Sequence, residues 1–243
     1  MQQEEQPLSG GNMDPVTKLG DTVRRVSGPW TEAVHDLLDL YASAAIPETP
    51  RAMGLDTHNR EILTFIEGET LDAAPPETRW APSTLRAAAA LLRRLHDASA
   101  PLAQTPRVWR TATHEPAEVV CHNDFAPYNL IVRDGRLVGV IDFDMASPGS
   151  RLWDLAYLAY RLTPYAEDAA GFDPDRFGSR EHRLRELIAA YGADFTPPEV
   201  RAAAALRLDD LAAFTDQRAA DTGRHDFTRH AAMYRRDATR LRA

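Results

Sequence analysis

Short runs of alternating apolar and polar residues occupy the first part of the chain. The segments 16–19 and 22–26 flank a Gly-Asp pair that is typical of a tight turn, so they predict a hairpin. Over 30–41, apolar residues recur every three or four positions, which predicts a helix with Thr31 as its N-cap. The pattern therefore indicates a strand-rich region with one helix.

A last strand ends the first region, and the composition changes after about residue 70. A strand is expected at 62–66, ended by Gly68, and the Pro- and Ala-rich stretch 71–82 has no periodicity and resembles a linker. Beyond it, apolar residues share one face over 84–96, which predicts a strong helix with Ser83 as its cap.

The second half of the chain has mainly helical spacing, interrupted by one hairpin. Asp134-Gly135 is a strong signal for a two-residue turn between two apolar runs. Together the elements predict an α+β protein of two lobes, strand-rich over 1–68 and mainly helical over 69–243. Further helices are expected at 153–162, 198–219 and 226–242.

The hairpin brings two polar side chains together. A two-residue loop pairs Arg133 with Arg136, which sets Asn129 opposite Val140. Asp142 is two residues further along the same face, so its Cβ is expected roughly 7–8 Å from that of Asn129. An amide oxygen and a carboxylate at that separation can share a hard cation, and Mg²⁺ fits because it prefers oxygen ligands.

The loop that enters the hairpin carries a further carboxylate. Asp124 lies five residues before Asn129, and a carboxylate held there can orient a substrate hydroxyl and accept its proton. His122 comes two residues earlier and is expected to brace the loop.

Composition narrows the classes of function. With 28 Lys and Arg against 36 Asp and Glu, the formal charge of the 243 residues is −8, which argues against nucleic-acid or anionic-membrane partners. Cys121 is the only cysteine, so an intrachain disulfide and a Cys-based zinc site are excluded. No apolar run approaches the roughly 20 residues of a membrane span, and the acidic N-terminus is unlike a secretory signal. A cytoplasmic protein is expected.

At this point the sequence resembles a known family. The motif H-x-D-x4-N at 122–129, followed by I-D-F-D at 141–144, resembles the catalytic loop and metal motif of the protein-kinase-like fold. With Pro-Gly at 148–149 and Trp-Asp-Leu-Ala at 153–156, the pattern is similar to the aminoglycoside phosphotransferase family, which includes choline-kinase-like enzymes. Asn123 replaces the arginine of protein kinases and no long activation segment follows, which favours a small-molecule acceptor.

The resemblance implies a role for each matching residue. Asp124 is the catalytic base or hydroxyl orienter, and His122 belongs to its loop. Asn129 and Asp142 bind the metal on the nucleotide phosphates. Asp154 begins a helix and holds the catalytic loop by a hydrogen bond, although such an acid also stabilises the helix dipole by itself.

The resemblance also implies an ATP site between the lobes. Gly10 and Gly11 are candidates for the loop at the phosphates, with a flexible tail as the alternative. Arg25 stands where a lysine is expected at the α- and β-phosphates, with an exposed basic strand edge as the alternative. The acidic partner of this cation is unsettled, since the helix offers Glu32 in its first turn and His35 where a carboxylate is expected.

The remaining candidates are positional. Thr64 and Ile66 lie in the segment that resembles the hinge, where adenine is recognised by backbone groups. Asp144 faces the substrate or stands behind the metal ligands. Asp210 lies on a helix whose acids suit an amine-bearing substrate, with a solvated helix face as the alternative.

These features together predict a small-molecule phosphotransferase, similar to aminoglycoside phosphotransferases. It is expected to move the γ-phosphoryl group of ATP, with GTP as the alternative donor, to a substrate hydroxyl with Mg²⁺. Its partners are then a nucleoside triphosphate and a small hydroxyl-bearing substrate, for which a cationic and an uncharged compound are both open. The alternatives are a metabolic kinase for an amino alcohol or sugar, and a catalytically inactive nucleotide-binding protein on the same fold. The acceptor and the oligomeric state stay open.

Overall fold

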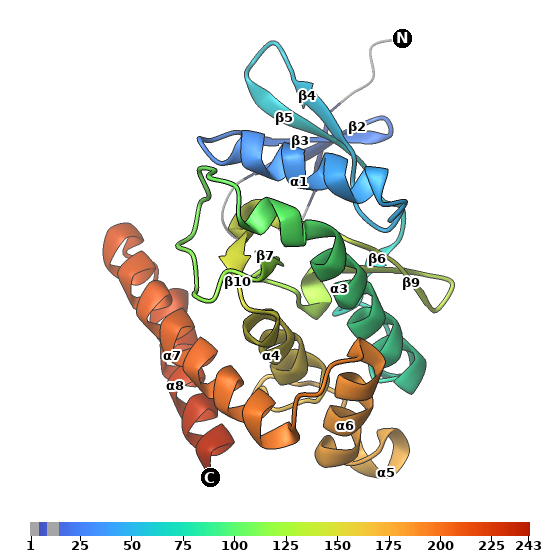
Figure 1. Ribbon diagram of the computed structural model, residues 1–243, viewed down its shortest axis with the longest axis vertical. Coiled ribbons are helices and arrows are strands. Elements are labelled where there is room, and N and C mark those ends of the chain that lie inside the picture. Colours follow the sequence, from blue (N-terminus) through green and yellow to red (C-terminus); the bar gives the residue numbers. More distant parts are fainter. Residues whose placement is uncertain (1–4, 9–14) are drawn as a thin grey trace. The chain divides into compact units, whose positions relative to one another are not determined.

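A computed structural model describes residues 5–8 and 15–243 (Figure 1). Its contacts divide the chain into two compact units. The first comprises the residues up to Arg79 together with Arg94–Ser150, and the second comprises Trp80–Arg93 together with Arg151–Ala243. The lobes expected at 1–68 and 69–243 stay a prediction, because these two units group residues by their contacts and do not define lobes.

A five-stranded antiparallel sheet opens the first unit, with the strand order β1-β2-β3-β5-β4. The predicted hairpin is confirmed, since β2 and β3 pair across their Gly-Asp turn. The strand expected at 62–66 begins and ends two residues earlier. The strands are β1 (Gln6–Leu8), β2 (Val16–Leu19), β3 (Thr22–Val26), β4 (Ala52–Leu55) and β5 (Arg60–Thr64).

The helix α1 (Thr31–Ser43) lies against one face of this sheet (Figure 1). Its predicted apolar face is buried, including Val34, Leu37 and Tyr41. The expected N-cap is wrong by one residue, because Thr31 is already helical and Trp30 is the cap. The Thr31 hydroxyl instead accepts a hydrogen bond from the amide of Gly28, 2.9 Å away and outside the helix.

The stretch expected to be a linker, 71–82, is part of the folded structure. Leu71 and Trp80 are almost fully buried, and α2 (Pro76–Arg79) lies between them. The following helix α3 (Pro82–Ala103) is longer than predicted and begins before Ser83, which is therefore not its cap. Proline fits the first turn of a helix because its missing N–H has no partner there.

The second hairpin forms as expected around its turn but with a shifted register. Arg133 pairs with Arg136, yet a bulge follows, so Leu130 rather than Asn129 lies opposite Val140. Asn129 instead accepts a hydrogen bond from the amide of Ile141. The hairpin strands are β8 (Leu130–Arg133) and β9 (Arg136–Val140), and β6 (Glu69–Thr70) pairs with β8 as the third strand of this sheet. In a separate two-stranded sheet, β7 (Val119–Cys121) pairs with β10 (Ser147–Gly149).

The second unit is helical. The three helices expected at 153–162, 198–219 and 226–242 are confirmed, each with ends that differ by up to three residues. The four-residue helix α5 and the twelve-residue helix α6 were not predicted from the sequence. The helices are α4 (Arg151–Leu162), α5 (Pro174–Phe177), α6 (Arg180–Tyr191), α7 (Pro197–Thr222) and α8 (His225–Arg242).

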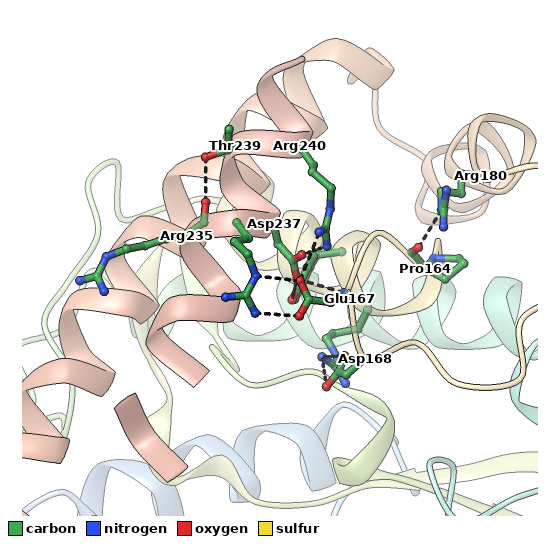
Figure 2. Close-up of polar contacts among 11 residues, drawn as sticks. Pro164, Glu167, Asp168, Arg180, Arg235, Asp237, Thr239 and Arg240 are labelled. Carbon is green, nitrogen blue, oxygen red and sulfur yellow. Dashed lines mark hydrogen bonds and ion pairs between the residues drawn. The ribbon is translucent and has the colours of Figure 1, made fainter. Parts of the chain in front are cut away.

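A buried carboxylate fastens α8 within this unit. Asp237 accepts hydrogen bonds from the Tyr160 hydroxyl at 2.6 Å and from the Glu167 amide at 3.1 Å, and it also pairs with Arg240 (Figure 2). The Tyr160 bond ties α8 to α4, and α8 also runs beside α7 (Figure 1). Across the described part of the chain, no helix is both long enough and apolar enough to cross a bilayer.

Candidate active site

The loop after β7 is held by His122, which is buried. Its Nε2 lies 3.0 Å from the carbonyl oxygen of Ile141, so this nitrogen carries the proton that is donated there. The other ring nitrogen, Nδ1, then accepts the amide of Asp124 at 3.2 Å. The imidazole thus links the loop to the end of β9, the contact that bracing of the loop requires.

The Asp124 carboxylate lies in a dense set of hydrogen bonds. The side-chain amide nitrogen of Asn129 donates to its Oδ2 and to its backbone oxygen, each at 2.9 Å. The hydroxyl of Tyr128 donates to its Oδ1 at 2.5 Å. Asn129 and Tyr128 both belong to the 3₁₀ turn η1 (Pro127–Asn129), so one short turn orients this carboxylate.

Asp142 directly follows the hairpin, in a left-handed backbone conformation with φ of 67°. The hydrogen bond between the Ile141 amide and the Asn129 carbonyl keeps this end of the hairpin beside η1. The Asp142 side chain is 45% exposed, which makes it the open carboxylate of the site. The hairpin thus brings the backbone beside Asp142 to Asn129, although the register differs from the expected one, and metal binding by the two residues stays a prediction.

Arg25 reaches this region from β3. Its Nη2 lies 3.0 Å from Asp142 Oδ1 and 2.5 Å from Asp144 Oδ1, and its Nε lies 3.8 Å from Glu61 Oε2. Burial lowers the pKa of the guanidinium, but the three carboxylates outweigh burial and raise that pKa. Arg25 is therefore a permanent cation surrounded by three carboxylates.

The partner of Arg25 differs from both candidates on the helix. Glu61 pairs directly with Arg25 across β3 and β5 and is 2% exposed. His35 contacts this carboxylate, with Nε2 3.0 Å from Glu61 Oε1, so it acts beside the partner and does not replace it. Glu32 is exposed. Glu61 is missed by sequence reasoning because its identification requires the register between two strands, in which Arg25 and Glu61 are partners 36 positions apart in the sequence.

Asp144 lies between two guanidinium groups. Arg25 contacts its Oδ1, and Nη1 of Arg110 lies 3.0 Å from its Oδ2. The Arg110 guanidinium also stacks on the ring of Trp30 at 4.4 Å. Burial raises the pKa of Asp144, and the two arginines oppose this rise. No motif pointed to Arg110, since it lies in an irregular segment; contact with substrate stays a prediction for Asp144.

The residues expected around the nucleotide are only partly described. Gly10 and Gly11 lie outside the described residues. Thr64 ends β5, and both its amide and its hydroxyl bond to Arg51. A Cβ added to Gly139 in the hairpin would lie 2.8 Å from the side chain of Ile66. Their roles in adenine binding stay predictions.

Two expected site residues belong to the second unit. Asp154 is fully buried in the first turn of α4. Asp210 lies on α7 and its Oδ2 is 3.2 Å from Nη1 of Arg207. Their catalytic and substrate roles stay predictions.

The donor atoms of the first unit fit a magnesium ion. Because the amide nitrogen of Asn129 is bound to Asp124, its amide oxygen is the atom that remains to act as a ligand. The exposed carboxylate of Asp142 is the second hard oxygen donor. Mg²⁺ commonly takes one or two protein oxygens and keeps waters or phosphate oxygens for its other positions.

Comparisons with known proteins agree with this geometry. The model of a phosphotransferase enzyme family, APH, matches residues 102–206, which include the catalytic-loop motif and the hairpin. The trifolitoxin immunity protein of Rhizobium leguminosarum bv. trifolii is 33% identical over 198 residues, covering 76% of this chain and 73% of that protein.

Solved structures share the fold at low sequence identity. An ethanolamine kinase from Plasmodium vivax has a TM-score of 0.72 at 15% identity, covering 98% of this chain and 82% of its own. A choline/ethanolamine kinase family protein from Mesorhizobium loti gives 0.63 at 19%, with coverage of 98% and 87%. A spectinomycin phosphotransferase in complex with ADP and spectinomycin gives 0.67 at 13%, with coverage of 98% and 92%. The expected protein-kinase-like α+β fold is confirmed.

Proposed function

This chain belongs to the APH phosphotransferase family, and we propose that it transfers the γ-phosphoryl group of ATP to a hydroxyl group of a small molecule. GTP is the alternative donor. The observation that carries the proposal is the convergence of Asp124, Asn129 and Asp142 at one end of the hairpin, joined by hydrogen bonds through η1.

Asp124 is the group that handles the acceptor. It orients the acceptor hydroxyl and takes its proton as the oxygen forms a bond to phosphorus and the bond to the ADP oxygen breaks. Support comes from the fixed position of Asp124: Asn129 donates to its Oδ2, and its backbone amide donates to His122. Phosphoryl transfer depends mainly on such positioning and on charge neutralisation.

Three residues act on the phosphates of the nucleotide: Asn129 and Asp142 through the metal ion, and Arg25 directly. Mg²⁺ bound by the first two would neutralise phosphate charge. Arg25 supplies a cation that is permanently charged, in the part of the chain where the family pattern has a lysine. Lys18, on β2, is the only lysine of the sequence. Its ammonium group lies 3.7 Å from the centre of the Phe65 ring.

The acceptor class is open between two groups that the structural neighbours represent. One neighbour is named an ethanolamine kinase and another binds spectinomycin, so amino alcohols and aminoglycoside-type antibiotics are the first compounds to test. Sugars complete the panel. ATP consumption that rises with one class and stays at background with the others identifies the acceptor.

The function is tested with Asp124→Asn, and Asp134→Asn in the exposed hairpin turn is the matched control. We expect the wild type to be stabilised against heat by ATP only in the presence of Mg²⁺. Asp124→Asn should keep this stabilisation and lose about 100-fold or more in turnover, while the control keeps both. Stabilisation by ATP that ignores Mg²⁺ would count against the metal site.

The rival function, a nucleotide-binding protein without catalysis, gives a different result. In that case ATP and Mg²⁺ stabilise the protein, but no acceptor raises ATP consumption. Asp124→Asn then behaves like the wild type in every assay.

A further inference from the structure

The exposed face of the proposed base carries an aromatic residue. Tyr128 is 36% exposed, which is unusual for a large aromatic side chain in this protein, and its hydroxyl donates to Asp124 Oδ1 at 2.5 Å. A phenol in this position makes the same hydrogen bond that an acceptor hydroxyl must make with the base.

The two carboxylate oxygens of Asp124 have different surroundings. Oδ2 is bound by the Asn129 amide, inside η1, and Asn129 is buried. Oδ1 is bound by the hydroxyl of the partly exposed Tyr128. An acceptor that arrives from solution therefore meets Oδ1, together with the phenol that covers it.

We propose that Tyr128 is a specificity-determining residue of the acceptor site, whose phenol holds the place of the acceptor hydroxyl on Asp124 Oδ1 until an acceptor displaces it. The inference rests on the proposed function. Displacement replaces one hydrogen bond to the carboxylate by another, so an acceptor succeeds when it gains binding energy elsewhere in its structure. Water gains none, and the phenol thereby protects ATP from hydrolysis.

The local structure allows this exchange. Tyrosine turns about two side-chain bonds, and Tyr128 is the exposed residue of a three-residue turn whose other two residues are buried. Its departure leaves Asp124 oriented, because the Asn129 and His122 contacts do not involve the phenol. The carboxylate is therefore ready for the incoming hydroxyl as soon as the ring moves.

The experiment measures single-turnover hydrolysis of MgATP by the full chain without any acceptor. Tyr128→Phe removes only the hydroxyl, and Tyr128→Leu removes the ring as well. Tyr165→Phe, in the second unit, is the matched control. Binding of MgATP is measured calorimetrically for every variant, and hydrolysis is also measured for Asp124→Asn combined with Tyr128→Phe.

We expect both Tyr128 variants to hydrolyse MgATP about tenfold faster than the wild type, because water then no longer has to displace a hydrogen bond to a charged group. MgATP affinity should stay within about twofold, because the phenol bonds to Asp124, which is not one of the proposed phosphate ligands. The control should match the wild type, and the double variant should lose the gain.

Three results would overturn the inference. Unchanged or slower hydrolysis by Tyr128→Phe with intact MgATP binding means that the phenol does not guard Oδ1, and the proposed function then survives. Phosphate found on Tyr128 by mass spectrometry means that the phenol is itself an acceptor. A wild type that does not bind MgATP removes the proposed function and the inference together.

Discussion

Arg25 shows how much depends on the shape of one cation. Its guanidinium contacts Asp142 and Asp144 through one nitrogen and approaches Glu61 through another. An ammonium group is a point charge on a flexible stem and does not offer this fork. The three carboxylates are therefore arranged to suit an arginine, in the place where the family pattern has a lysine.

Arg25→Lys should weaken MgATP binding by about tenfold and lower the melting temperature, because one ammonium group cannot satisfy three carboxylates at these distances. Arg24→Lys is the matched control, since Arg24 is the adjacent residue and bonds to Thr22 on the same strand. Calorimetric titration with MgATP measures the affinity. Equal losses in the two variants would show that the cation acts only through the stability of the sheet.

At this scale the sequence predicts the residues that lie close together along the chain. The spacing of Asp124, Asn129 and Asp142 was sufficient, since all three lie within one loop and one hairpin. Glu61 and Arg110 escaped prediction because they approach the site from a distant strand and from an irregular segment. Tyr128 lay within the motif, but hydrogen-bond geometry was needed to connect its hydroxyl with the base.

Among the elements, the second hairpin shows the limit of register arithmetic. The Asp-Gly turn fixes the pairs next to it, so Arg133 and Arg136 pair as predicted. The strand β9 then carries one extra residue, Val138, opposite the step from Val132 to Ile131, and every pair beyond it is shifted. The shift moves Asn129 out of the strand and into η1, where its side chain can reach Asp124.

The segment that leads from β5 into β6 depends on Gly68. This residue has φ of 148°, and a Cβ added to it would lie 2.5 Å from the carbonyl oxygen of Val132. Gly68→Ala should lower the free energy of unfolding by about 3 kcal/mol, because both the backbone conformation and the β8 backbone must yield.

Gly135→Ala is the control for this substitution. Gly135 also has positive φ, at 71°, but nothing lies within 4 Å of an added Cβ. Gly135→Ala should lower the free energy of unfolding only by the cost of the left-handed backbone conformation, about 1 kcal/mol. Urea unfolding of both variants measures the difference, and equal losses would mean that the approach to Val132 costs nothing.

For the whole molecule, the fold class and most helices follow from the sequence because their apolar spacing is regular. The stretch 71–82 did not follow, since Leu71 and Trp80 are buried singly and leave no periodic signal. The helices α5 and α6 were not predicted for a related reason: α5 has only four residues, and α6 carries charged residues on several sides. Tertiary contacts, rather than local pattern, decide such segments.

The stability of the whole chain should fall in alkaline solution, and Tyr191 supplies part of this fall. It ends α6 with 1% of its surface exposed, and burial raises its pKa to about 12 against the opposing hydrogen bond from Arg151. In the unfolded chain a tyrosine loses its proton near pH 10. Above that pH the native state binds more protons than the unfolded state, so the free energy of unfolding decreases as pH rises.

For this one group the decrease should be about 1.4 kcal/mol between pH 8 and pH 11. Tyr191→Phe lacks the ionisable hydroxyl, so its stability should fall by that much less than the wild type over the same interval, whatever the substitution costs at pH 8. Urea unfolding at the two pH values gives both differences. Parallel losses in the two proteins would show that Tyr191 ionises as readily in the fold as in the open chain, which is incompatible with a phenol sealed between α6 and its neighbours.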